Sequence, residues 1–308
     1  MPDIESFPLI IGDGACGTNL QNMTIPDSAW PGREGCNELL NTSAPEIVRE
    51  LHRSFVEAGA MLLETNTFGA SRSVLAEYGL EDQVVPINHA AVQNARQAAR
   101  DRDPVWVAGS IGPTTKLVSL GHIDRDTLAA AFHEQATALI EAGADVLIIE
   151  TCQDLLQVKT AIVSAFEAME GLGRDIPLMV SVTIEQTGTM LVGSDIAAVA
   201  ATLAPFPLFS LGLNCATGPD AMLSHMRYLN HHWPKRISCI PNQGLPEVQD
   251  GKTVYKLDPD TYAGRMREFV TELGVSIVGG CCGTTPAHTR ALVKALDGII
   301  PAMREISS

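Results

Sequence analysis

Basic residues are scarce in this chain: 21 Lys and Arg stand against 36 Asp and Glu, which gives a formal net charge of −15. An acidic surface repels nucleic acids, because binding a phosphate backbone needs clustered Lys and Arg. We therefore expect no nucleic-acid partner. The charge indicates no other particular function.

A targeting segment and a membrane-spanning stretch are also missing. The first ten residues, MPDIESFPLI, contain neither a basic region nor a long apolar core, so they do not resemble a secretory signal. The most apolar later stretch, residues 196–213, contains Pro205 and Pro207, which interrupt the continuous helix that a membrane span requires. These absences predict a soluble, cytoplasmic protein without a membrane partner.

The cysteines do not form the even set that a disulfide framework needs. There are seven, in a long chain without a recognisable secretory signal. Free thiols in such a protein serve either packing or chemistry. The seven are Cys16, Cys36, Cys152, Cys215, Cys239, Cys281 and Cys282.

Short apolar runs alternate with amphipathic segments along the whole chain. Eight runs have the character of strands, at residues 8–13, 60–65, 105–110, 144–151, 177–184, 208–214, 236–242 and 275–280. Eight amphipathic segments lie between and after them, at 45–58, 86–101, 124–142, 154–170, 195–203, 219–230, 258–273 and 286–297. Such alternation predicts a parallel sheet covered by helices. Eight units in 308 residues predict a single-domain (β/α)8 TIM barrel over residues 1–308.

Polar side chains and thiols gather where the predicted strands end. In a (β/α)8 barrel the chemistry lies at the carboxyl ends of the strands. Here these ends carry Asp13 and Gly14, Glu64, Glu150, Asn214 and Cys215, and Cys281 and Cys282. We expect these carboxylates, amides and thiols to meet on one rim of the barrel.

Three of the cysteines can meet above the barrel axis. Cys215 ends the sixth predicted strand, and Cys281 and Cys282 follow the eighth, where flanking glycines let the backbone turn. Alternate strands contribute side chains to the same layer of a barrel. Three thiolates with one open position predict a catalytic zinc site. Two buried thiols beside a strained vicinal disulfide remain the alternative, and the other four cysteines are expected to be packing residues.

Other familiar motifs are weak or missing. Residues 12–17 match Gly-x-Gly-x-x-Gly, but a dinucleotide site also needs a helix opening at the glycines. Residues 18–42 are rich in Asn, Pro and Gly, and instead predict a loop over the barrel mouth, as a lid or partner surface. No His-Glu-x-x-His is present, and no predicted strand contains the lysine that a Schiff-base aldolase requires.

The runs around the cysteines resemble a known family. LGLNCATGPD (residues 211–220) and IVGGCCGTTPAH (residues 277–288) are similar to the two zinc-cysteine motifs of the homocysteine S-methyltransferases. The runs GDGACGTNLQ, GCNELLN, ETNTFGASRSVLAEYGL, AGSIGPTTK and PNQGLP extend this resemblance from about residue 9 to 297. They are most similar to the homocysteine-binding module of cobalamin-dependent methionine synthases.

The resemblance implies an enzyme that methylates homocysteine to methionine at a zinc ion. It implies zinc ligands at Cys215, Cys281 and Cys282, and substrate contacts around Asp13, Gly14, Glu150 and Asn214, while Glu64 matches the second-strand motif. Homocysteine is a zwitterion, so its ammonium needs an anionic partner, for which we select Glu150 and Asp13. Cys16 stands where the family often has methionine.

The methyl donor is not fixed by these motifs. The family's cobalamin-binding motif begins Asp-x-His, and none of the eight histidines here has Asp two residues before it. We therefore expect a methylcorrinoid (methylcobalamin) supplied by a separate corrinoid protein or domain. The alternatives are a small donor such as S-methylmethionine, S-adenosylmethionine or betaine, a non-catalytic subunit that binds homocysteine or zinc, and a lyase with Glu64 and Glu150 as acid and base.

Overall fold

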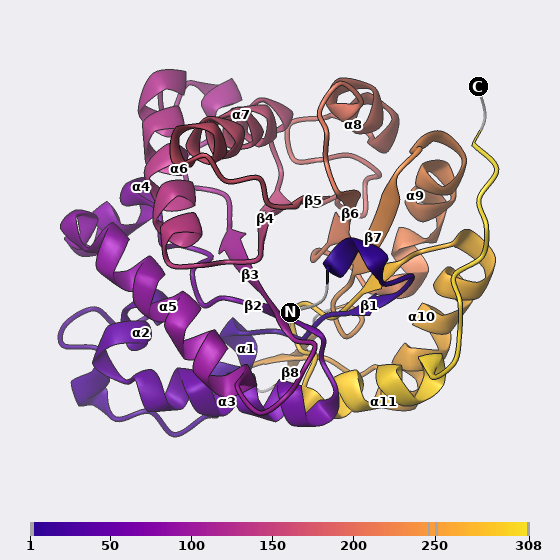
Figure 1. The fold of residues 1–308 in the computed structure, drawn as a ribbon, viewed down its shortest axis with the longest axis horizontal. Helices are drawn as coiled ribbons and strands as arrows, with labels where there is room; N and C mark the ends of the chain where they lie inside the picture. Colours follow the sequence, from indigo (N-terminus) through magenta and orange to yellow (C-terminus); the bar gives the residue numbers. More distant parts are fainter. Residues whose placement is uncertain (1–2, 246, 250–251, 307–308) are drawn as a thin grey trace.

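Eight parallel strands form the wall of a barrel in the computed structural model (Figure 1), which describes residues 3–245, 247–249 and 252–306. In chain order they are β1 (Ile10–Ile11), β2 (Leu62–Glu64), β3 (Trp106–Ile111), β4 (Val146–Cys152), β5 (Leu178–Val182), β6 (Ser210–Asn214), β7 (Arg236–Ile240) and β10 (Ile277–Val278). Each strand pairs with its neighbours in this order, and β1 also pairs with β10. A bridge between Gly12 and Leu62 joins β1 to β2. The ring is thus closed, and the predicted (β/α)8 barrel is confirmed.

The helices between the strands form an outer ring. They are α3 (Pro45–Ala58), α5 (Val84–Ala99), α6 (Arg125–Glu141), α7 (Leu155–Leu172), α8 (Ile196–Leu203), α9 (Pro219–His232), α10 (Pro259–Leu273) and α11 (Pro286–Leu296). Local sequence sets their ends. The side chains of Asp124, Asp154, Asp195 and Asp258 accept hydrogen bonds from backbone N–H groups in the first turns of α6, α7, α8 and α10. Gly59 ends α3 in the left-handed conformation.

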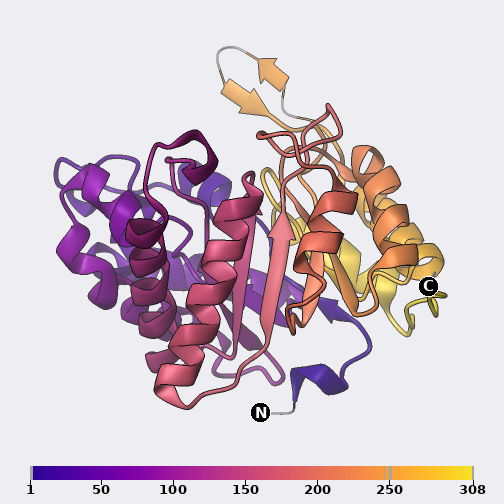
Figure 2. The same cartoon turned by 90° about the horizontal axis from the view of Figure 1, so that it is seen from above.

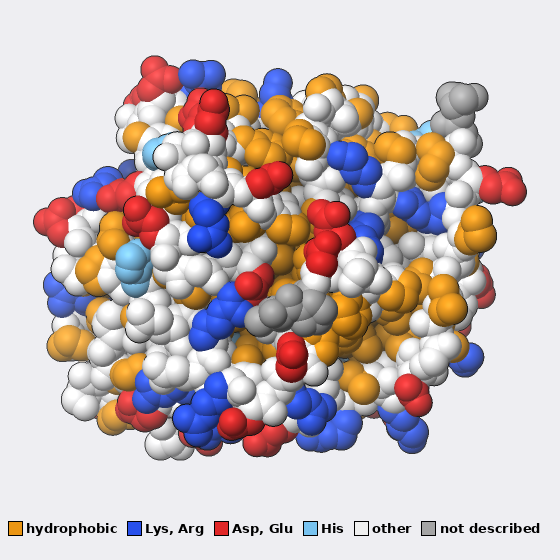
Figure 3. Space-filling view, in the orientation of Figure 1, with side chains coloured by type: hydrophobic (Ala, Val, Ile, Leu, Met, Phe, Trp, Pro, Cys, Tyr) orange, Lys and Arg blue, Asp and Glu red, His pale blue; other side chains and the backbone are white. Residues whose placement is uncertain are grey.

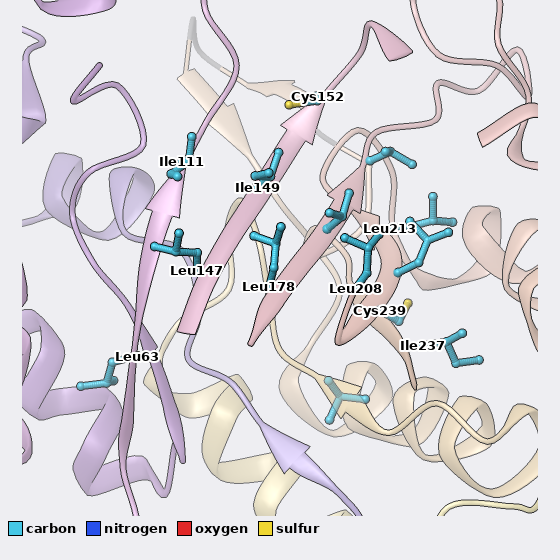
Figure 4. Close-up of a cluster of buried hydrophobic side chains, with 14 of the residues drawn as sticks. Leu63, Ile111, Leu147, Ile149, Cys152, Leu178, Leu208, Leu213, Ile237 and Cys239 are labelled. Carbon is cyan, nitrogen blue, oxygen red and sulfur yellow. The ribbon is translucent and has the colours of Figure 1, made fainter. Parts of the chain in front are cut away.

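Two layers of apolar side chains hold the barrel together. In β4, Leu147 and Ile149 point toward the helices and join the large outer cluster, whereas Val146 and Ile148 join a smaller cluster around the barrel axis. Figure 4 shows the outer layer, in which Cys152 and Cys239 lie among the aliphatic side chains. Both are fully buried, as is Cys36 in a third cluster, so these three cysteines pack as expected.

The amino end of the barrel is plugged. Residues Ile4–Ser6 form the short helix η1, and Ile4 packs into the inner cluster. Phe7 meets the Trp106 ring edge to face at 4.9 Å. In Figure 2 this plug lies at one end of the barrel, and the hairpin β8 (Glu247–Gln249) and β9 (Lys252–Val254) projects from the other. Because the plug fills the amino end, we expect a functional site at the carboxyl end of the barrel.

The segment after β1 is more ordered than predicted. It contains the helices α1 (Gly17–Asn22), η2 (Asp27–Ala29), η3 (Asn37–Leu39) and α2 (Leu40–Ser43). A helix of six residues does open at the last glycine of the Gly-x-Gly-x-x-Gly match, so the expectation of a plain loop there was wrong. The Asn19 side chain donates hydrogen bonds to the carbonyls of Ala15 and Thr284, and these contacts outweigh the weak helix propensity of the sequence.

The surface of the described residues has two plain features. No helix in the described part of the chain is long and apolar enough to cross a bilayer. On the face drawn in Figure 3, Lys and Arg side chains are interspersed with acidic ones and form no continuous basic patch.

Candidate active site

Three thiols meet at the carboxyl end of the barrel. The Sγ atoms of Cys215 and Cys282 are 3.9 Å apart, those of Cys281 and Cys282 are 4.0 Å apart, and all three lie within 4.8 Å of one another. A tetrahedral zinc ion with bonds of about 2.3 Å places its sulfur ligands about 3.8 Å apart. The spacing therefore fits a zinc ion with three sulfur ligands and one open position.

The vicinal disulfide alternative does not fit the same geometry. A disulfide bond is about 2.05 Å long, whereas the Cys281 and Cys282 sulfurs are 4.0 Å apart. All seven cysteines are free thiols.

Turns after β6 and β10 bring the thiols together. Cys215 and Ala216 have left-handed backbones, with φ of 61° and 53°, a conformation that costs non-glycine residues about 1–3 kcal/mol. The Cys215 N–H donates to the Ile240 carbonyl at 3.2 Å, and the Cys281 N–H to the Pro241 carbonyl at 2.8 Å. Both cysteine turns are thus tied to the end of β7, which fixes the distance between them.

The three thiols share their protons unequally. Hydrogen bonds from Cys215 and Cys281 stabilise the thiolate of Cys282 and lower its pKa. Interactions with Cys215 and Cys282, together with burial, raise the pKa of Cys281 well above its usual range. A lowered pKa at Cys282 favours the thiolate, which is the form of cysteine that binds a metal ion.

Three acidic side chains face the same end of the barrel from β1, β2 and β4. Glu150 accepts hydrogen bonds from Ser110 Oγ at 2.5 Å and from Asn214 Nδ2 at 3.2 Å. Asp13 Oδ2 accepts from the backbone N–H of Glu64 at 3.1 Å. Within the described residues, the Glu64 carboxylate itself accepts no hydrogen bond.

Burial raises the pKa of each of these three carboxyl groups. For Glu64 the charges of Glu150 and Asp13 add to the effect of burial. For Asp13 the nearby Glu150 charge likewise raises the pKa. A bound cation stabilises such a cluster of carboxylates. An ammonium group is a suitable cation, because it can donate hydrogen bonds to several carboxylates at once.

A cavity of about 290 Å³ connects the acids with the thiols. Its walls include Gly14, Glu38, Glu64, Glu150, Thr151, Cys215, Cys281 and Cys282. No Lys or Arg is among the described residues that line it. Since drug-sized ligands need roughly 300–1,000 Å³, this volume suits a ligand of amino-acid size.

Two of the expected substrate residues, Asp13 and Asn214, lie behind the cavity wall. Asp13 reaches it through the backbone of Glu64. Asn214 Oδ1 accepts from the Thr151 N–H at 3.0 Å, and its Nδ2 donates to Thr151 Oγ1 at 2.6 Å. Thr151 has φ of 58° and lies where the pairing of β4 with β5 shifts, so Asn214 holds a bulge beside Glu150.

Gly14 also owes its identity to packing. A Cβ at this position would lie 2.8 Å from both the Phe55 ring and Thr284 Oγ1. This glycine of the Gly-x-Gly-x-x-Gly match therefore permits close contact between the first βα loop and its neighbours. The acids of the adjoining cavity would repel a pyrophosphate, which argues against a dinucleotide site.

Two further residues, Glu38 and Cys16, line the cavity, and of these Glu38 was not expected from the sequence. Glu38 is half-buried and its Oε1 accepts from the Gly69 N–H at 2.7 Å. The sequence leaves open whether Cys16 only packs or lies near the thiols. It packs against the core and also lines the cavity, and its thiol donates to Asn66 Oδ1 at 3.4 Å. The signals were present in the runs GCNELLN and GDGACGTNLQ, although neither run specifies which side chain faces the cavity.

Curated relatives share this chain almost from end to end. It is 41% identical to the methionine synthase of Mycobacterium tuberculosis over 99% of its length, and 42% identical to that of Mycobacterium leprae over 95%. It spans only 26% and 25% of the length of those two proteins.

Solved structures share the fold. The homocysteine methyltransferase MmuM from Escherichia coli aligns in its oxidized form with a TM-score of 0.75, at 23% identity, over 94% of this chain and 97% of that one. Its metallated form aligns with a TM-score of 0.74 at 24% identity, over 94% and 96% of the two chains. A model of the homocysteine S-methyltransferase family matches residues 10–296, close to the range over which the sequence motifs resemble that family. The chain therefore belongs to the homocysteine S-methyltransferase family.

Proposed function

We propose that this chain transfers a methyl group to the thiol of homocysteine, forming methionine, with zinc held by Cys215, Cys281 and Cys282. The observation that carries the proposal is the spacing of the three sulfurs, 3.9 and 4.0 Å along two edges, which matches tetrahedral zinc. The names of the mycobacterial relatives and the metallated form of the Escherichia coli enzyme support it.

Each part of the site has a task in this reaction. When bound, zinc lowers the pKa of a fourth thiol, so that it is a thiolate at neutral pH. Three cysteine sulfurs keep the centre electron-rich, and hence keep the substrate sulfur nucleophilic. Such thiols must stay reduced, so we place the chain in the cytoplasm.

The acidic wall binds the amino-acid end of the substrate. Glu64 and Glu150 face the cavity and accept hydrogen bonds from the homocysteine ammonium, while Asp13 adds negative charge from behind Glu64. Asn214 and Ser110 hold the Glu150 carboxylate in place. The substrate is thus held at one end by charge and at the other by its sulfur.

The methyl donor approaches from the barrel mouth. A sulfur lone pair attacks the methyl carbon, and the donor keeps the electron pair of the bond that breaks. We propose a methylcorrinoid carried by a separate protein or domain as the donor. A cavity of about 290 Å³ has no room for a corrin ring beside homocysteine, which supports presentation of the cofactor from outside.

A donor comparison tests the proposal. Zinc-loaded protein receives homocysteine with methylcobalamin, or with S-methylmethionine, S-adenosylmethionine or glycine betaine, and methionine is measured. We expect turnover with methylcobalamin that is lost after zinc removal. Turnover with only one of the small donors would show that this molecule, and not a methylcorrinoid, supplies the methyl group. Homocysteine binding without turnover would indicate a non-catalytic subunit, and activity that survives zinc removal would favour a lyase.

A further inference from the structure

Tyr255 lies against the cysteine turn, on a segment that the sequence motifs do not explain. It directly follows β9 of the hairpin seen at the barrel mouth in Figure 2. A Cβ on Gly283 would lie 2.5 Å from the Tyr255 ring, so the ring covers the turn at the residue after Cys282. The Tyr255 side chain also contributes to lowering the pKa of Cys282, the residue before Gly283.

The backbone beside Tyr255 is anchored from two sides. Gln243 Nε2 donates to the Leu257 carbonyl at 2.8 Å, and His288 Nε2 lies 3.2 Å from the same oxygen. His288 also caps the start of α11, the helix that follows the cysteine turn. The Tyr255 ring is therefore held against the cysteine turn by the loop after β7 and by the start of α11.

The three cysteine sulfurs differ in what covers them. Cys281 packs against the inner apolar cluster of the barrel. Cys282 directly precedes Gly283, against which the Tyr255 ring lies. A ligand thiolate is itself a nucleophile, and its methylation would form an S–C bond as the donor keeps the electron pair of the broken bond. The product is a neutral thioether, which binds zinc less well than a thiolate.

We propose that Tyr255 is a positioning residue that donates a hydrogen bond to the Cys282 sulfur and shields it, so that the methyl group reaches the substrate thiol and not this ligand. The proposal rests on the proposed function of the site. A neutral phenol is a donor at physiological pH, and a hydrogen bond to a thiolate withdraws charge from the sulfur. Partners of this kind tune metal ligands without touching the metal.

Alkylation of the zinc-loaded protein tests the hydrogen bond directly. Iodoacetamide forms an S–C bond and releases iodide, and fragmentation of the labelled peptide separates Cys281 from Cys282. Without homocysteine, Tyr255→Phe should label at Cys282 about threefold to tenfold faster than the unchanged protein, a factor typical of one hydrogen bond. Tyr255→Ala should label faster still, because the ring is also lost. Labelling at Cys215 should stay within about twofold.

The matched control is Tyr228→Phe, on α9, where the ring stacks on His232 with centroids 4.2 Å apart. Its labelling rates should equal those of the unchanged protein. With cobalt in place of zinc, the sulfur-to-cobalt charge-transfer band of Tyr255→Phe should move to lower energy, which a purely structural role of the ring would not cause.

Equal labelling of Cys282 in the Tyr255→Phe and unchanged proteins, both loaded with zinc, would overturn the role of Tyr255. Zinc content is measured first in every protein. If the unchanged protein takes up no zinc, the proposed function fails, and this result is distinct from the failure of the Tyr255 proposal.

Discussion

Replacing Glu64 by Gln should stabilise the free protein while weakening substrate binding. The Glu64 carboxylate lines the cavity, accepts no hydrogen bond within the described residues, and is destabilised by burial and by the charges of Glu150 and Asp13. Glu64 is half-buried, and each unit by which its pKa is raised costs the ionised form about 1.4 kcal/mol, so we expect a penalty of about 1–3 kcal/mol. The amide removes the charge at nearly constant volume, so the free energy of unfolding should rise by about that amount at pH 7.

The stability gained by Glu64→Gln should decrease as the pH falls. Since the pKa of Glu64 is higher in the folded than in the unfolded protein, the folded protein binds the proton first as the pH falls. In the unchanged protein, the free-energy penalty of the ionised Glu64 therefore decreases as the pH falls from the pKa of the folded protein to the unfolded value near 4.5. Below that pH, Glu64 is protonated in both states. The advantage of Glu64→Gln should be complete above the folded pKa and should vanish near pH 4.5.

Thermal unfolding followed by circular dichroism measures this difference. For a protein of this size, about 1–3 kcal/mol corresponds to roughly 2–6 °C in Tm. The control is Glu57→Gln, at an exposed position on α3. It should leave Tm unchanged both at pH 7 and near pH 4.5. Homocysteine affinity of Glu64→Gln, measured by calorimetry, should fall. A lower Tm at pH 7, or a gain of the same size at both pH values, would refute the idea that Glu64 is an unpaired charge awaiting a cation.

Four further substitutions separate the tasks of the site. Metal analysis should show that Cys215→Ala and Cys282→Ala each bind less zinc than the unchanged protein. The control, Cys239→Ala in the packed outer layer, should keep its zinc. Full zinc occupancy in Cys215→Ala or Cys282→Ala would contradict the ligand assignment. Glu150→Gln should weaken homocysteine binding by about 1–3 kcal/mol with unchanged zinc content, and an unaltered affinity counts against its role. Asn214→Ala should lower the free energy of unfolding by about 1–3 kcal/mol, because it leaves the Thr151 N–H without its partner; an unchanged Tm would show that other contacts hold the bulge.

The barrel could be predicted because its signals are local and repeated. Each helix has an apolar stripe, and four begin at an Asp whose side chain caps the first turn. The order of the elements then leaves few topologies, of which the barrel is the one that buries eight parallel strands. The meeting of the three cysteines follows from the same argument, since strand ends in a barrel share one rim.

The short helix α1 and the hairpin β8–β9 could not be predicted in this way. α1 depends on the Asn19 side chain reaching the carbonyl of Thr284, a contact across 265 residues of sequence. The backbone beside Tyr255 is held at Leu257 by Gln243, in the loop after β7, and by His288, in α11. Such contacts exist only once the barrel has closed, so no window of sequence contains them.

The bulge in β4 shows why the substrate wall was only partly foreseen. Strand alternation places Val146, Ile148 and Glu150 toward the barrel axis, so the direction of Glu150 follows from the sequence. The left-handed backbone of Thr151 does not, because Thr rarely adopts it unaided. Asn214, two strands away, supplies both hydrogen bonds that hold this conformation. Asn214 also directly precedes Cys215, so the residue that shapes the acidic wall is joined through the backbone to one of the three thiols. The amino-acid end and the sulfur end of the substrate site are therefore coupled through β6, and a change at Asn214 should disturb both.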